Sequence, residues 1–484
     1  MEPSRSAEDG TDNDMMDDSF PYQFSGPFPC DASSFVMPIL SPFAGESCPR
    51  MRSPSIVHRP GLRHGAGSST VAGTTPWFAW VWRTALTAKE RMLAAMRGQP
   101  VDRIPWAPRM DLWMIALRAR KAIPPRFAAA ANTVEISRAM GTGCHAVRAD
   151  YTLSRAPAEM TLRGFGVDNH PDYPFSVVID DLPVEFSARE GNLRTSIRTP
   201  AGTVVTHLEQ SAEMTRNGIS LPFVKEYPIK SVSDFEAVGA VFEHMKIVPT
   251  PEAYRAFHRR IGDEGVAVAN GPLGASPLHL LLHDLCPMDL FFYLYADERK
   301  ALRKLAGRIE PFFESMLDAV CASSAEVCLW GANYDRDLTW PPFFREEIAP
   351  WLRRAAERLH RAGKLLLTHT DGENHGLLPL YPEVGFDVAE SVCPAPMTRL
   401  SLAQIREGMG KRIAVWGGIP SVALLPRSMD ERSFESYLDG LFASLGDGRG
   451  LILGVSDNVP PDADLGRMER IAERIERFGP AGRG

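Results

Sequence analysis

Several apolar runs in the C-terminal half of the chain end abruptly in polar residues. Runs of this length are typical of buried strands, and segments with helical periodicity separate them. Buried strands that alternate with helices indicate a parallel sheet, and in a closed eight-stranded barrel the residues at the strand ends converge on one rim. The pattern therefore predicts an α/β fold, a (β/α)8 barrel, with an active site at that rim. The residues that follow the runs are Asn333 and Asp335, His369 and Asp371, Glu390, Gly417 and Gly418, and Ser456 and Asp457.

Helix start signals lie between these strands. Thr87 and Glu90 form a capping box, in which each side chain binds a free amide of the first turn, and we expect this helix to end near Gly98. Three further boxes predict helix starts, and helical periodicity fills two longer stretches. The further boxes are Ser233–Glu236, Ser401–Gln404 and Ser428–Glu431, and the longer stretches are 298–321 and 344–362.

Between about residues 174 and 213 the chain changes to short strands of alternating polarity. The predicted strands are 176–180, 193–197 and 203–206, with glycine-containing turns between them. We interpret this region as an antiparallel meander inserted in the barrel.

The N-terminal region has a different composition from the rest. The first twenty residues hold seven acidic residues and one arginine, and the next stretch is rich in Ser, Pro and Gly. Such a chain buries too little apolar surface to offset its ordering entropy, so residues 1–75 are predicted to be a disordered tail. The aromatic strip Trp77–Trp82 lies in a segment, 76–86, that we expect to dock on the barrel or on a partner. Residues 87–480 are predicted to form the barrel.

The overall composition limits the classes of function. A net charge of −7 gives no electrostatic reason to expect nucleic acid. Seven widely spaced cysteines, an odd number without a C-x-x-C pair, favour a reducing compartment and predict a cytoplasmic protein. No apolar run approaches the roughly 18 residues that would indicate a membrane span. We therefore expect an enzyme with a small-molecule substrate.

Several motifs together carry a family resemblance: residues 87–98 followed by 102–105, Pro341–Phe344, His369–Gly372, Gly417–Ile419 and Ile452–Pro461. They resemble the uroporphyrinogen decarboxylase superfamily, which includes the cobalamin-dependent methyltransferases such as methylcobamide:coenzyme M methyltransferase. The resemblance covers roughly residues 86–480 and implies the same (β/α)8 barrel, with a homodimer as a family-level expectation.

The methyltransferase branch of this superfamily implies a metal site. That branch holds zinc with an H-x-C motif and a distant cysteine just before a closing Pro-Pro. Here His369 matches the histidine, while Asp371 and Asp457 take the two cysteine positions. A histidine with two carboxylates is a harder donor set that suits zinc, manganese or iron with less selectivity. An alternative for Asp371 is that it caps a helix beginning after Gly372.

The resemblance also suggests residues around the metal. Asp150 matches the catalytic aspartate of the decarboxylases, and Arg109 is the one arginine in the region of their carboxylate-binding motif. Glu390 is a candidate fourth ligand or general base, or an ordinary strand-end carboxylate. The candidate substrate-binding residues are Asn270, Asn333, Asp335 and Arg109.

Three functions remain open from the sequence. The first is methyl or one-carbon transfer, assisted by a divalent metal and by a corrinoid on a separate partner protein. The second is a decarboxylase of the uroporphyrinogen type that needs no cofactor, in which Asp150 or Asp371 stabilises a protonated intermediate. The third is a barrel that binds a ligand without turnover.

Overall fold

The computed structural model divides the chain into two compact units, Met1–Ala79 and Trp80–Gly484, and the description below concerns the second. The predicted tail, 1–75, and most of the aromatic segment, 76–86, lie outside the described residues. The structure describes residues 85–147, 157–219 and 221–482.

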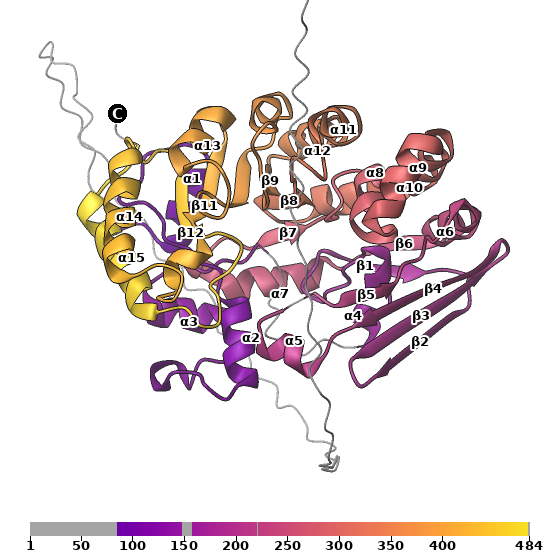
Figure 1. Ribbon diagram of the computed structural model, residues 1–484, viewed down its shortest axis with the longest axis horizontal. Coiled ribbons are helices and arrows are strands. Elements are labelled where there is room, and N and C mark those ends of the chain that lie inside the picture. Colours follow the sequence, from indigo (N-terminus) through magenta and orange to yellow (C-terminus); the bar gives the residue numbers. More distant parts are fainter. Residues whose placement is uncertain (1–84, 148–156, 220, 483–484) are drawn as a thin grey trace, which may run out of the picture. The chain divides into compact units, whose positions relative to one another are not determined.

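The centre of this unit is a parallel sheet of six strands with the spatial order β12-β11-β10-β9-β8-β7 (Figure 1). Strands that are adjacent in the sheet are also consecutive in the sequence. After each strand the chain therefore crosses back and begins the next strand parallel to the one before. Nearly every residue of these strands is buried, which explains their continuous apolar runs. The strands are β7 (Val268–Asn270), β8 (Val327–Ala332), β9 (Leu365–His369), β10 (Val388–Val392), β11 (Ala414–Ile419) and β12 (Leu451–Val455).

Backbone hydrogen bonds continue past β12. Ala107 N donates to Leu453 O over 2.9 Å, and Leu453 N donates to Pro105 O over 2.9 Å. The segment around Trp106 therefore lies parallel to β12, and Gly143 N donates to Trp106 O over 2.8 Å on its other side.

The same kind of contact occurs beside β7. Val268 N donates to Ala146 O over 3.1 Å, and Cys144 N donates to Glu264 O over 2.6 Å. Residues 143–146 thus lie between β7 on one side and the segment around Trp106 on the other, and that segment in turn lies beside β12.

Helices link and flank the strands. The two longest crossovers lead from β7 to β8 and from β8 to β9. The first contains the long helix α10, and the second contains α12, which packs against both β8 and β9 (Figure 1). The helices are α1 (Ala88–Met96), α2 (Asp111–Ala119), α3 (Thr133–Met140), α4 (Pro157–Met160), α5 (Ala212–Arg216), α6 (Phe235–Glu243), α7 (Pro251–Ile261), α8 (Pro277–Leu280), α9 (Met288–Asp297), α10 (Arg299–Ala322), α11 (Pro341–Phe343), α12 (Ala349–Arg361), α13 (Leu402–Met409), α14 (Glu431–Ser444) and α15 (Leu465–Phe478). Among the described ranges, none of these helices combines the length and apolar character that crossing a bilayer requires.

Two of the predicted capping boxes are confirmed and two are wrong. The Thr87 and Ser401 boxes start α1 and α13 as expected. The box at Ser233 is displaced, because Ser231 accepts the amide of Ser233 and begins a 3-10 turn instead. The helix expected after Ser428 is capped by Asp430, whose carboxylate accepts from the Ser433 amide.

The predicted meander is present, but only two of its three expected strands belong to it, and it contains two strands, β2 (Val184–Arg189) and β5 (Phe223–Glu226), that the sequence did not indicate. The antiparallel sheet has the order β2, β3 (Asn192–Thr199), β4 (Gly202–Glu209) and β5. The turn between β2 and β3 places Glu190 and Gly191 in the left-handed region, with φ of 47° and 80°. Successive positive φ angles match the twist of a tight hairpin.

The strand expected at 176–180 does not belong to this meander. It forms β1 (Phe175–Ile179), which pairs antiparallel with β6 (Met245–Pro249) in a separate two-stranded sheet. The sequence predicted the strand correctly but not its partner, because periodicity carries no information on pairing across 70 residues.

His279, in α8, is a fully buried titratable group beside the sheet. Its Nδ1 accepts a hydrogen bond from the Ala275 amide over 3.0 Å, and its ring stacks on Tyr334 with centroids 5.6 Å apart. Burial lowers the pKa of His279 to about 3, with the neighbouring His283 acting in the same direction. The ring is therefore held in its neutral form.

This burial predicts acid sensitivity. In the unfolded chain this histidine has a pKa near 6.5, so it binds a proton below that pH. In the folded chain it stays neutral down to about pH 3. The free energy of unfolding should therefore fall as the pH drops through this window, by about 2–3 kcal/mol from this group at pH 4.5. In the His279→Asn variant, which keeps an acceptor for the Ala275 amide, urea unfolding should show a correspondingly weaker loss between pH 7 and 4.5. An equal loss in both proteins would contradict the assignment.

Candidate metal site

The structure brings His369, Asp371 and Asp457 together at the carboxyl ends of β9 and β12. One ligand atom from each of the three lies within 4.8 Å of the others. His369 Nε2 and Asp457 Oδ1 are 3.9 Å apart. All three side chains are partly buried, so the cluster lies at the rim of the sheet, within reach of a small solute.

A strained backbone positions Asp457. It follows β12 with a φ of 52°, and its amide donates to Ser391 Oγ over 2.9 Å, where Ser391 also has a positive φ of 62°. Left-handed conformations are uncommon outside glycine and cluster at functional sites. The preceding Ser456 is buried and donates to the carbonyl oxygens of Val392 and Ile419, which fixes the end of β12 against β10 and β11.

Asp371 does not cap a helix. Its Oδ1 accepts from the Gly372 amide over 2.9 Å, but the chain then continues through turns, and the next helical turn is at Leu378–Glu383. The helix expected directly after Gly372 was therefore wrong, and the capping explanation of Asp371 loses its basis. Its carboxylate faces the cluster instead.

Glu390 is buried between two imidazole rings. Its Oε2 accepts from His369 Nδ1 over 2.6 Å, and its Oε1 accepts from His145 Nε2 over 2.8 Å. With Nδ1 of His369 bonded to Glu390, the other ring nitrogen, Nε2, is the one that faces the acidic residues of the cluster. Glu390 thus orients the histidine of the cluster.

The sequence did not point to His145. It lies on the segment beside β7, with its ring centroid 4.7 Å from that of Trp416. The available signal was a polar residue inside the apolar run Cys144–Val147, which indicates a buried side chain that needs a partner.

The charges in the cluster perturb one another. Burial alone would raise the pKa of Glu390, but the charge and hydrogen bonds of His369 and His145 hold it well below its usual range. Burial would lower the pKa of His369, yet Glu390, with Asp457 and Asp371, raises it. Burial raises the pKa of Asp371, and the charge of Asp457 adds to this against the opposing effect of His369.

Arg109 reaches the cluster from the segment before α2. Its guanidinium binds Asp111 with Nε and Nη2, at 2.9 and 3.0 Å, and Asp457 Oδ1 with Nη1 at 2.8 Å. The other carboxylate oxygen of Asp457 accepts a hydrogen bond from the side-chain amide of Asn458. The contacts of Arg109 in this structure position Asp457, and its expected role in binding a substrate stays a prediction.

The donor set fits a divalent cation. Three carboxylates lie near His369: those of Asp371 and Asp457, which belong to the cluster, and that of Glu390. The guanidinium of Arg109 binds Asp457 but is shared with a fourth carboxylate, Asp111. An imidazole nitrogen and two carboxylate oxygens form the kind of facial set that leaves positions open for a substrate. A bound cation would also relieve the repulsion that raises the pKa of Asp371.

Asn333 lies beside the cluster without joining it. It follows β8 with a φ of 58°, its amide donates to His369 O over 2.9 Å, and its side chain bonds His283 Nε2 over 2.8 Å. His283 Nδ1 in turn lies 2.9 Å from the buried carboxylate of Asp284. Asn333 therefore connects the rim to a second polar pair on the π-helical turn Leu281–Leu285.

Asp335 has a local structural role in this arrangement. One carboxylate oxygen accepts from the Glu373 amide over 3.0 Å and the other from the Asp337 amide over 2.8 Å. These contacts tie the loop after β8 to the loop after β9. Asp335 is not one of the residues that the structure brings to the cluster.

Asn270 ends β7 and is almost completely buried. Its Oδ1 has no hydrogen-bond partner in the described structure. Such orphaned polar atoms are rare in native interiors, so Asn270 remains a candidate for contact with a bound solute.

The sequence candidate Asp150 lies outside the described residues. Burial raises the pKa of Cys393 to about 11, so this thiol is protonated at neutral pH and has the character of a core residue.

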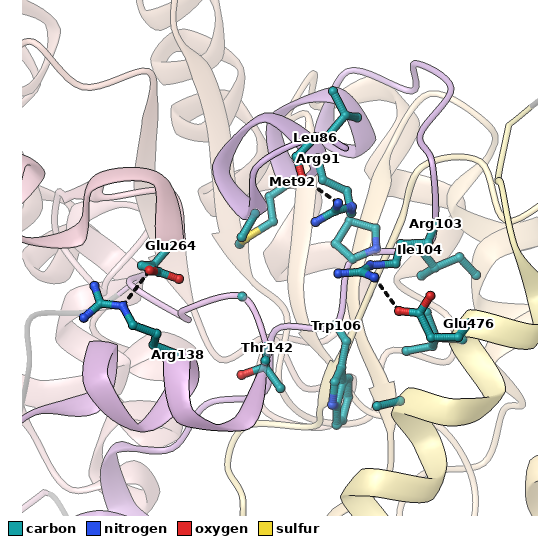
Figure 2. A pocket seen from close by; sticks show the side chains of 16 residues that line it. Leu86, Arg91, Met92, Arg103, Ile104, Trp106, Arg138, Thr142, Glu264 and Glu476 are labelled. Carbon is teal, nitrogen blue, oxygen red and sulfur yellow. Dashed lines mark hydrogen bonds and ion pairs between the residues drawn. The ribbon is translucent and has the colours of Figure 1, made fainter. Parts of the chain in front are cut away.

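A cavity of about 230 Å³ lies apart from the cluster (Figure 2). Its walls include Ile104 and Thr142, which come before the strand segments at Trp106 and Cys144, so it lies toward the amino ends of the strands. Figure 2 shows Arg103 paired with Glu476 and Arg138 with Glu264. None of the cluster residues lines this cavity, and we do not include it in the candidate site.

Comparison with known proteins leaves the family open. No family model matches the sequence, and no curated protein matches it. Among solved structures, the chain is similar to a methyltransferase from Methanosarcina mazei, with a TM-score of 0.48 and 15% identity over 81% of this chain and 99% of that one. It is also similar to a dipeptide epimerase from Methylococcus capsulatus, with a TM-score of 0.20 and 13% identity over 63% of this chain and 80% of that one. Similarities of this size carry no inference about activity.

Proposed function

We propose that this protein is a metal-dependent transferase of a methyl or related one-carbon group, with a divalent cation held by His369, Asp371 and Asp457. The observation that supports it is the convergence of three potential ligand atoms within 4.8 Å of one another, two from the end of β9 and the third from the distant end of β12. When bound, the cation would supply Lewis acidity toward an acceptor or leaving group.

The architecture that we propose for the site is a closed eight-stranded barrel. Its six named strands would be joined by the segments 105–107 and 143–146, since these are hydrogen-bonded to β12, to each other and to β7 in turn. In such a barrel the carboxyl ends of all strands face one rim, which is where active sites of this architecture lie.

The protein residues around the cation have separate tasks in this proposal. Glu390 fixes the tautomer of His369 so that Nε2 faces the site, as carboxylate–histidine pairs do around bound metals. Arg109 holds Asp457 and keeps a positive charge beside the substrate position. Asn270 and Asn333, at the ends of the two adjacent strands β7 and β8, would orient the substrate.

Transfer of a methyl group, in preference to other groups, rests on the sequence resemblance. A corrinoid carried by a separate partner protein would be the methyl donor or acceptor. The open rim beside Asp457, whose side chain is 40% exposed, suits the approach of such a partner. Copurification of a protein with corrinoid absorption from the natural source would support this part of the proposal.

One observation favours a second candidate, decarboxylation. Arg109 is a buried arginine at the rim, and an arginine there is the natural partner for a substrate carboxylate. Against it, Asp111 and Asp457 already bind this guanidinium, so a substrate carboxylate would have to displace one of them.

The metal content tests the main proposal. Purified wild-type protein, exposed to Zn²⁺, Mn²⁺ or Fe²⁺ and desalted, should retain about one equivalent of metal per chain by elemental analysis. Asp371→Ala and Asp457→Ala should lose it, because each removes one of three ligands. Asp337→Ala, which changes an exposed aspartate nearby, is the matched control and should retain the metal. Full retention in the two ligand variants, with circular dichroism showing all proteins folded, would refute the site.

Glu390 should control affinity without being a ligand. Glu390→Gln replaces one acceptor by a donor, so His369 is no longer held with its Nε2 unprotonated, and the metal affinity should fall roughly 10- to 100-fold. Isothermal titration with Zn²⁺ measures the change. Glu347→Gln alters another poorly exposed carboxylate, which Tyr295 and Arg303 bind, and should leave the affinity unchanged. Equal affinity in wild type and Glu390→Gln would exclude the positioning role.

Incubation with uroporphyrinogen separates the two candidate reactions. We expect no release of carbon dioxide from either metal-loaded or metal-free protein, because the second carboxylate-binding arginine of the decarboxylase motif is absent around Arg109. Release at a rate that Arg109→Lys abolishes would favour decarboxylation over group transfer.

A further inference from the structure

The strand β2 is the outer strand of the antiparallel meander (Figure 1). It pairs with β3, and no other strand within the described residues pairs with it. Five of its six residues are exposed, including Val184 at 37%. An edge of this kind presents free backbone groups to any chain that can pair with it.

The hydrogen-bond pattern shows which backbone groups are free. Arg198 N donates to Pro183 O over 3.1 Å, so residue 183 belongs to a hydrogen-bonded pair with β3. Because these pairs alternate along antiparallel strands, Glu185 and Ser187 also bond to β3. The N–H and C=O groups of Val184, Phe186 and Ala188 therefore point to the open edge.

The side chains of these three residues continue the buried face of the sheet. Val184 pairs with Ile197, and Phe186 pairs with Thr195, so each pair lies on one face. Ile197 and Thr195 are buried, and α6 packs against β3 and β4. The cover ends at β2, where the apolar residues are half-buried or exposed. This edge also lacks the lysine or internal proline that commonly protects edge strands.

The opposite face of β2 carries two charges of opposite sign, Glu185 and Arg189, four positions apart with Ser187 midway between them. Both side chains are exposed, and Glu185 also pairs with Arg198 of β3 over 3.2 Å. A two-fold axis through Ser187 would place Glu185 of one strand opposite Arg189 of the other, twice. The edge is therefore complementary in charge to a copy of itself, which is the requirement for an isologous interface.

We propose that a second copy of the chain pairs with this edge, its β2 antiparallel to the first and with Ser187 on the two-fold axis. Phe186 of each strand would then exchange N–H and C=O bonds with Ala188 of the other. Glu185 and Arg189 would meet at the positions without backbone bonds, where side chains lie closest. The two meanders would form one continuous sheet. The contact is short, so the dimer is a weak, concentration-dependent one.

Sedimentation velocity over a range of concentrations tests the interface in the full chain. The wild type should shift from monomer toward dimer as concentration rises. Arg189→Glu and Glu185→Arg each place like charges opposite one another, and each should weaken the dimer by about tenfold or more. Arg194→Glu changes an exposed arginine on the neighbouring strand, on the same face, and should leave the dimer unaffected.

Compensation distinguishes this register from other contacts. An equimolar mixture of the Arg189→Glu and Glu185→Arg proteins should form a heterodimer, because every facing pair is then opposite in sign. The double variant carrying both substitutions should form a homodimer again. A mixture that remains monomeric while the wild type dimerises would overturn the register.

A backbone substitution tests the pairing itself. Ala188→Pro removes an N–H that faces the open edge, where proline is tolerated, and should abolish the dimer while the protein stays folded by circular dichroism. Three results would overturn the proposal. The first is a wild type that stays monomeric up to its solubility limit, and the second is a dimer that Ala188→Pro leaves intact. The third is concentration-independent protection of the edge-facing amides of Val184, Phe186 and Ala188 from hydrogen exchange, which would mean that another segment of the same chain covers this edge.

Discussion

The carboxylate of Glu390, buried between His145 and His369, is the interaction on which the rest of the site depends. It joins the middle of β10 to the end of β9, and both of these to the segment beside β7, which lies more than 200 positions earlier in the chain. A buried carboxylate is costly unless its oxygens are bonded, and here both are. The same bonds decide which nitrogen of His369 faces Asp371 and Asp457. Packing and site chemistry therefore share one set of contacts.

The cluster is organised around a surplus of negative charge. Burial raises the pKa of Asp371, repulsion from the neighbouring carboxylates adds to this, and keeping this carboxylate ionised is a cost to the folded chain. Arg109 offsets part of it by binding Asp457. Strained backbone at Ser391 and Asp457 adds a further cost. Unfavourable features of this kind persist when the binding of a ligand offsets their free-energy cost, and a divalent cation has the charge and size to do so.

The sequence predicted those parts of the structure that local patterns encode. Apolar runs ending in His369 and Asp457 placed both residues at strand ends, and parallel strands bring such ends to one edge. Partners across the sheet carried no such signal. His145 bonds Glu390 across 245 positions of the chain, and Asp335 closes a loop where the pattern suggested a substrate contact. At helix starts, Asp430 replaced Ser428 because several nearby side chains could each cap the same turn.

The central claim is that His369, Asp371 and Asp457 hold one cation together, and anomalous diffraction tests it most directly. Crystals grown with Mn²⁺ should show a single strong anomalous peak within bonding distance of His369 Nε2 and of a carboxylate oxygen from each aspartate, with Glu390 bonded to the far side of the imidazole. A peak elsewhere in the chain, or no peak in crystals whose cluster is intact, would contradict the account.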